Sequence, residues 1–310
     1  MRIAIVDSGL ESQYLQENTE RIHFYIDDDD YINIDNDVHD ENGHGTFVYK
    51  LIKSICYDMD IQYVIVKVLD EKSRSNSELL TFALEYLLNI DLDIIILCLA
   101  SSNAGLNNKM QIITNRITSQ NKIMIASLNN NNGPSYPAIF KNVFGVQGMP
   151  LPLSTILYDP SADIQCTADA SNIFTMVFNK LSSFKGNSKA TAFFAACIIR
   201  HLQHINRIDI ECVHKELLNG SVGITYKGLS DDKIYEALLN YSCKYFSPGA
   251  DSKHIFSYFT DQESFTKYLI NVCHKFKINL ATVIFSIHDF VSIYSLHKKI
   301  LLEWSKQDVQ

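Results

Sequence analysis

The chain has 310 residues, of which 46% are hydrophobic and 20% charged, and its formal net charge is -8. This balance indicates a folded protein with a sizeable core, built as one large domain or as a domain of about 200 residues with a smaller companion. The mild acidic excess argues against a nucleic-acid partner, because proteins that bind nucleic acid carry a basic surface. No apolar run in the sequence is long enough to cross a membrane.

The cysteines indicate a reducing compartment. The chain has seven Cys, an odd number, and most of them lie inside apolar segments. Scattered thiols of this kind are typical of cytoplasmic proteins, and the short apolar run at residues 2–6 lacks the flanks of a signal peptide. No Cys-x-x-Cys pair or His/Cys cluster with metal spacing is present, so we predict a cytoplasmic protein without a metal site.

Strands and helices alternate over the first half of the chain. Such alternation predicts an α/β fold in which helices flank a parallel sheet. The predicted strands are residues 2–6, 61–68, 93–99 and 122–127, and the predicted helices are residues 46–57, 76–89 and 106–120.

The pattern changes in the second half. We expect loops and short strands over residues 151–185 and a strong helix over residues 188–205. From residue 232 onward the spacing predicts only helices, near residues 232–244, 262–275 and 289–305. The sequence therefore predicts a first domain over residues 1–225 and a small all-α domain over residues 231–310.

Three residues in the first domain carry the parts of a nucleophilic site. Asp7 follows the first strand, and His44 and Ser188 each open a predicted helix. Singly, each is more simply a turn residue or a helix cap. Together they supply a nucleophile, a base that can take its proton, and a carboxylate that orients the base.

The segments around these residues resemble the motifs of subtilisin-like serine proteases. Residues 3–9 (IAIVDSG), 42–46 (NGHGT) and 186–191 (GNSKAT) are similar to the first, histidine and serine motifs of that family. The order Asp…His…Ser is one of the known orders of this triad. The resemblance extends over about residues 1–205, and it implies a subtilisin-like fold with Asp7, His44 and Ser188 as the catalytic triad.

The resemblance also implies an oxyanion donor and a substrate site. It aligns Asn130 with the donor that stabilises the developing negative charge; Asn129 stays an alternative, because both lie in a run of four Asn. The run could also be no more than a polar turn. Leu97, Cys98, Leu99 and Ala100 resemble the edge strand that pairs with an extended substrate, and Leu128 would wall the adjacent pocket.

The chain departs from the family pattern at several positions. Asn187, Lys189 and Ala192 stand where the family usually has Thr, Met and Pro. The short stretch after His44 lacks the loop that holds calcium in many secreted members, and we interpret the acidic residues 27–30 as a solvated face. With Asp7 so near the first residue, we expect no folding prodomain.

Residues 231–310 resemble an acyl- or peptidyl-carrier protein. Ser264 would then match the serine that carries phosphopantetheine, although the motif around it is degraded. Two alternatives remain: a plain helical appendage, or a module that docks a biosynthetic partner. The whole chain is predicted to be an intracellular serine endopeptidase that removes the leader of a ribosomally made precursor peptide; the alternative is a weak or inactive peptide-binding relative whose C-terminal bundle docks that partner.

Overall fold

The computed structural model describes residues 1–130, 134–151, 155–203, 210–220, 222, 231–246 and 254–307. These residues divide into two compact units. The first unit consists of Met1–Ser171 and Phe184–Ile224, and the second of Asn172–Ser183 and Thr225–Gln310.

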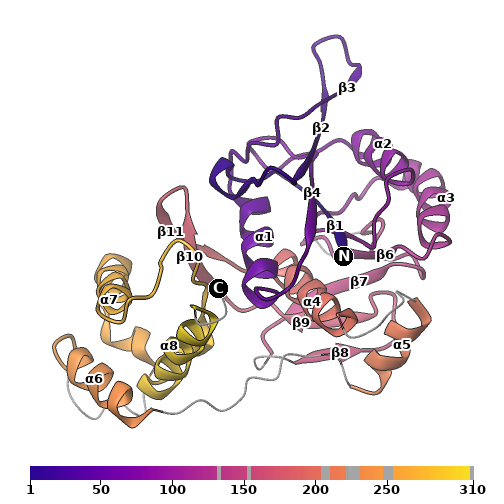
Figure 1. Ribbon diagram of the computed structural model, residues 1–310. Helices are drawn as coiled ribbons and strands as arrows, with labels where there is room; N and C mark the ends of the chain where they lie inside the picture. Colours follow the sequence, from indigo (N-terminus) through magenta and orange to yellow (C-terminus); the bar gives the residue numbers. More distant parts are fainter. Residues whose placement is uncertain are drawn as a thin grey trace. The chain divides into compact units, whose positions relative to one another are not determined.

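A mostly parallel sheet of nine strands forms the centre of the first unit (Figure 1). Its spatial order is β3-β2-β4-β1-β5-β6-β7-β9-β8, and only the two edge strands, β3 and β8, pair antiparallel to their neighbours. This architecture is the predicted α/β fold. The strands are β1 (Arg2–Asp7), β2 (Glu20–Ile26), β3 (Ile32–Asp35), β4 (Gln62–Lys67), β5 (Ile94–Leu97), β6 (Ile123–Ser127), β7 (Phe144–Met149), β8 (Ile156–Tyr158) and β9 (Cys166–Asp169).

The central strands β1, β4, β5 and β6 are apolar because both faces of the sheet are covered by helices. Strand β1 lies between β4 and β5, with Asp7 beside Lys67 and Val6 beside Leu97. The residues that follow these strands therefore meet at one edge of the sheet, where sites of parallel α/β folds collect.

The helices form two layers. Helix α1 packs against α4, and α2 packs against α3 on the other face of the sheet (Figure 1). Asn76 caps α2 by accepting the Glu78 N–H through its side chain. The helices of this unit are α1 (His44–Ile55), α2 (Ser77–Leu87), α3 (Asn107–Thr118), α4 (Asn187–Leu202) and α5 (Ile210–Leu218), with the 3₁₀ turns η1 (Ser12–Tyr14) and η2 (Ala104–Leu106).

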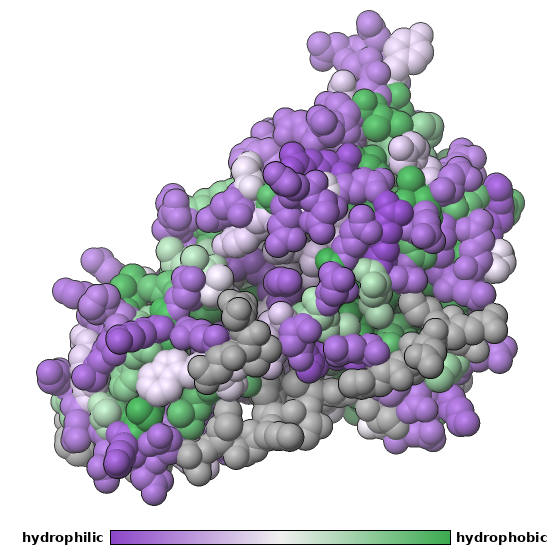
Figure 2. Space-filling model, viewed as in Figure 1, coloured by the Kyte–Doolittle hydropathy of each residue, from purple (hydrophilic) through white to green (hydrophobic). Residues whose placement is uncertain are grey.

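The hairpin of β2 and β3 extends beyond the rest of the first unit (Figures 1 and 2). Its tip carries the acidic residues 27–30, three of which are exposed. Asp27 instead closes the turn, since its carboxylate accepts the Tyr31 N–H and a hydrogen bond from Asn33. The hydrophilic colouring of the tip agrees with the predicted solvated face.

The second unit combines helices with a small sheet. Its helices are α6 (Asp232–Ser242), α7 (Gln262–Lys275) and α8 (Ile293–Gln307), with the 3₁₀ turns η4 (Ile255–Tyr258) and η5 (Ile287–Phe290). Its three strands, in the order β11-β10-β12, are β10 (Ile173–Val177), β11 (Lys180–Phe184) and β12 (Phe285–Ser286). Aromatic side chains, among them Phe265, Tyr268 and Phe290, fill the core.

Two details differ from the sequence expectation. The C-terminal region is not entirely helical, because β12 pairs antiparallel with β10. Segment 172–183, expected in the first domain, packs with the second unit, where the Thr175 hydroxyl donates to the Val283 carbonyl. The expected boundary between residues 225 and 231 falls on residues 223–230, outside the described residues. No helix in the described part of the chain could span a membrane.

Candidate active site

Asp7 and His44 form a hydrogen-bonded pair at the carboxyl edge of the sheet. Asp7 ends β1 and is 1% exposed, and His44 is the first residue of α1. The two side chains meet with 2.7 Å between His44 Nδ1 and Asp7 Oδ1. A carboxylate can only accept, so the proton of a neutral imidazole is on Nδ1 and the lone pair is on Nε2. His44 is therefore in the tautomer that a general base requires.

The surroundings of His44 favour its charged form. Burial by itself lowers the pKa of His44, but the charge and hydrogen bond of Asp7, with a smaller contribution from Asp40, outweigh it and raise the pKa. The ring also packs edge to face on Phe184, with centroids 5.3 Å apart. Both contacts hold the imidazole in one orientation.

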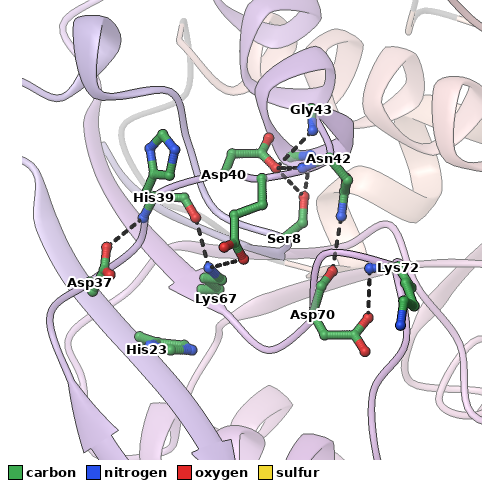
Figure 3. Close-up of polar contacts among 12 residues, drawn as sticks. Ser8, His23, Asp37, His39, Asp40, Asn42, Gly43, Lys67, Asp70 and Lys72 are labelled. Carbon is green, nitrogen blue, oxygen red and sulfur yellow. Dashed lines mark hydrogen bonds and ion pairs between the residues drawn. The ribbon is translucent and has the colours of Figure 1, made fainter. Parts of the chain in front are cut away.

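Asp40 organises the loop that carries His44, and the sequence analysis missed it. This fully buried carboxylate accepts hydrogen bonds from the Ser8 hydroxyl, the Gly43 N–H and both the N–H and hydroxyl of Thr46 (Figure 3 shows the bonds to Ser8 and Gly43). The signal was present, because an Asp that precedes a turn often accepts backbone N–H groups two or three residues on. Asp40 thereby ties the loop after β1 to the start of α1.

Two glycines let that loop press against α1. A Cβ atom on Gly45 would lie 2.2 Å from the carbonyl oxygen of Gly9, and Gly9 itself has a φ of +109°. Only glycine tolerates both the contact and the positive φ. The close approach explains the glycine after Asp7-Ser8 and the glycine after His44.

Ser188 lies beside the end of β5. It is the second residue of α4, directly after Asn187, and Gly186 precedes the helix with a φ of 85°. The Ser188 hydroxyl donates to the carbonyl oxygen of Cys98 at 3.0 Å. No hydrogen bond between Ser188 and His44 is present among the described residues, and catalytic hydrogen bonds of this kind are often loose before substrate binds.

His44 and Ser188 line the same cavity, of about 350 Å³. Its walls include residues 98–101, the segment 127–130 at the end of β6, and residues 75–77 at the start of α2. Cys98, Leu99, Ala100 and Leu128 therefore lie at the same cavity as His44 and Ser188, and their contact with a substrate stays a prediction. Within the described part of the chain, no Asp, Glu, Lys or Arg lines this cavity.

Leu97 is the exception among the expected substrate-binding residues. It is fully buried in β5, which pairs with β1 on one side and β6 on the other, so the predicted edge strand is wrong for this residue. A buried strand with two partners has no free main-chain groups for a substrate. The segment that borders the cavity begins one residue later, at Cys98.

Both candidate oxyanion residues line the cavity. Asn130 Oδ1 accepts a hydrogen bond from Asn187 Nδ2 at 3.1 Å, and the Asn129 N–H donates to Ser135 Oγ at 2.9 Å. The Asn run is therefore more than a distant polar turn, because two of its members face the nucleophile's cavity.

The chain is similar to known proteases. No protein-family model matches the chain. It is 25% identical over 209 residues to a curated thermostable alkaline protease of Halalkalibacterium halodurans. The chain resembles a subtilisin-like protease. The match spans 63% of this chain but only about half of the relative, 54% of its length.

Two solved protease structures share the fold. The prenylagaramide maturation protease PagA has a TM-score of 0.54 and 18% identity over 74% of this chain and 87% of its own. A lanthipeptide protease has a TM-score of 0.52 and 19% identity over 69% of this chain and 78% of its own. At such low identity the likeness establishes the protease fold and leaves the substrate open.

Ser264, the candidate carrier serine, lies in the second unit. It is exposed in the first turn of α7, where its hydroxyl donates to Asp261, the residue that caps the helix. Its phosphopantetheine modification stays a prediction. In the described part of the chain, no group of three or more His, Cys, Asp or Glu side chains could hold a metal ion.

Proposed function

We propose that this chain is a serine endopeptidase that cleaves peptide bonds through an acyl-enzyme on Ser188. The observation that carries the proposal is the Asp7–His44 hydrogen bond beside the cavity that Ser188 lines. It leaves His44 Nε2 as the one imidazole atom able to accept the serine proton. A buried carboxylate behind a histidine serves that chemistry directly.

The proposed reaction has two halves. Ser188 Oγ attacks the carbonyl carbon while His44 takes its proton, and Asp7 stabilises the imidazolium. The oxyanion receives hydrogen bonds from the Ser188 backbone N–H and from the Asn130 side chain. His44 then gives its proton to the leaving amine, and the same histidine activates the water that releases the acyl group.

The main chain beside the cavity suits an extended peptide. Leu99 and Ala100 make no backbone hydrogen bond within the described residues, whereas Ser101 pairs in both directions with Tyr136. A substrate strand could therefore bond to Leu99 and Ala100 by β-strand addition.

A dedicated precursor peptide is the proposed client. One of the two solved neighbours is a prenylagaramide maturation protease, and the other is a lanthipeptide protease. We extend that role to this chain as removal of the leader from a ribosomally made peptide, with the second unit as the dock for the precursor or a biosynthetic enzyme. All seven cysteines are free thiols, which supports action in the cytoplasm.

A fluorophosphonate probe tests the proposal. It should label the wild-type protein and leave Ser188→Ala unlabelled, and His44→Ala should label far more slowly. Absence of labelling in the folded wild-type protein would refute the endopeptidase. Mass spectrometry of candidate precursor peptides incubated with wild-type protein or Ser188→Ala then identifies the leader cleavage.

One observation favours the alternative, a peptide-binding protein of little or no activity. The Ser188 hydroxyl is hydrogen-bonded to the Cys98 carbonyl and not to His44. If that bond persisted with a peptide bound, Ser188 would stay unactivated. The same probe separates the two functions, because only the enzyme is labelled.

A further inference from the structure

The side chain of Asn187, immediately before the nucleophile, makes four hydrogen bonds. Its Oδ1 accepts from the Gly148 N–H at 2.8 Å. Its Nδ2 donates to the Leu128 carbonyl and to Asn130 Oδ1, both at 3.1 Å, and makes a longer contact of 3.5 Å with the Asn129 carbonyl. A carboxamide nitrogen carries two N–H groups, so the two shorter contacts use both of them.

The backbone partners determine which way the Asn187 amide faces. The Gly148 N–H can only donate and the Leu128 carbonyl can only accept, so the oxygen and nitrogen of Asn187 cannot be exchanged. The site is also sterically tight. A Cβ on Gly148 would lie 3.2 Å from Asn187 Oδ1 and 2.6 Å from the Ala170 Cβ.

This orientation passes to Asn130. Because Asn187 donates an N–H, Asn130 accepts this hydrogen bond with its Oδ1. The Nδ2 of Asn130 then remains as a donor. Among the described residues, no acceptor takes a hydrogen bond from Asn130 Nδ2. Asn130 and Ser188 line the same cavity, so this donor is available at the site of the chemistry.

We propose that Asn187 is a positioning residue that sets the amide of Asn130 as the oxyanion donor. The inference rests on the proposed function and adds a specific role to a residue that replaces the family's usual Thr. An exposed Asn side chain without such a partner can present either its nitrogen or its oxygen to the cavity. The oxygen would repel the oxyanion, whereas a preorganised N–H stabilises it at no cost of reorientation.

Such a role affects the transition state and leaves substrate binding nearly unchanged. Loss of a donor that acts only on the oxyanion lowers kcat with little change in KM. If Asn187 acts through Asn130, its substitution should also have no further effect on kcat in a variant that already lacks the Asn130 side chain. These two properties distinguish positioning from a general loss of stability.

A double-mutant cycle tests both properties. The substrate is a quenched fluorescent peptide, selected from a pooled library because wild-type protein cuts it and Ser188→Ala does not. Asn130→Ala should lower kcat by about 10²–10³-fold, and Asn187→Ala by about tenfold with KM within about twofold. The double variant should match Asn130→Ala. If kcat of the double variant instead falls by the product of the two single fold-losses, the proposal is overturned.

Asn187→Asp sharpens the test. It keeps the acceptor for the Gly148 N–H but replaces the donor with a carboxylate oxygen, toward which Asn130 should turn its Nδ2. We expect kcat to fall below that of Asn187→Ala, and full activity of both variants would overturn the inference.

Asn142→Ala, which removes a hydrogen bond to Thr118 elsewhere in the first unit, is the matched control. If the wild-type protein cuts no library peptide and binds no fluorophosphonate, the proposed function has failed; an active wild type with an additive cycle refutes the role of Asn187 alone.

Discussion

Lys189 and Asp169 form a buried ion pair directly behind the nucleophile, with 2.6 Å between Nζ and Oδ2. The ammonium also donates to the Asp169 carbonyl oxygen at 2.8 Å. Burial alone raises the pKa of Asp169, but the charge and hydrogen bond of Lys189, with those of Ser171, lower it, so the carboxylate is ionised. The pair ties the first turn of α4 to the end of β9.

Lys189→Met should destabilise the protein by about 3–5 kcal/mol, because it leaves the Asp169 charge buried without its partner. Urea unfolding followed by circular dichroism measures the change. The double variant Lys189→Met with Asp169→Leu should recover much of the loss, since apolar residues of similar volume often replace a buried pair at no cost. An unchanged unfolding midpoint in Lys189→Met would contradict the buried pair.

The pH profile should report the Asp7–His44 pair. Only neutral His44 can act as the base, and its pKa is raised above the ordinary 6.5, so kcat/KM should fall as the pH drops through a value above 6.5. Asp7→Asn removes the charge that opposes burial, so the acid limb should move to lower pH. Its kcat should also fall by about 10⁴-fold, because the neutral amide favours the wrong tautomer. An acid limb that stays in place in Asp7→Asn would contradict this assignment.

Gly45→Ala tests the close approach of the loop after β1 to α1. The added methyl would lie 2.2 Å from the Gly9 carbonyl oxygen, so the start of α1 must shift. We expect a destabilisation of about 1–3 kcal/mol, typical of overpacking. Fluorophosphonate labelling should slow by more than the folded fraction explains, because His44 moves with the helix. Gly105→Ala, where the nearest atom to the new Cβ is a side-chain oxygen 3.1 Å away, is a milder control.

The cavity should discriminate against charged side chains. Apart from His44 and Cys98, its lining is formed by hydroxyl, amide and aliphatic side chains, none of which carries a charge that could pair with a charged substrate side chain. Fluorogenic peptides with Lys, Arg, Asp or Glu near the cleaved bond should have kcat/KM at least about tenfold below uncharged analogues. Leu128→Asp, at the cavity wall, should selectively improve cleavage of the Lys and Arg peptides. A wild-type preference for basic peptides would refute this prediction.

Much of the first unit could be predicted because its signals are local. The runs that became β1, β5 and β6 are apolar throughout, as central parallel strands must be. The helices α1 and α4 carry apolar residues at helical spacing and begin beside glycine. The β2–β3 hairpin was not predicted, although Ile22 and Phe24 alternate with polar residues in β2, because β3 is only four residues long and has no buried position, and an acidic turn joins the two strands.

The amino-acid sequence by itself determined the α/β fold, the resemblance to proteases and the three residues of the candidate triad, because strand periodicity and short motifs are properties of neighbouring residues. Only the tertiary structure decided that Leu97 is interior, that segment 172–183 packs with the second unit, and that Asp40 and Asn187 support His44 and Asn130. These relationships join residues far apart in the chain: Asn187 bonds to Asn130 across 57 positions. No local pattern encodes such a contact; it exists only once the sheet brings the ends of its strands together.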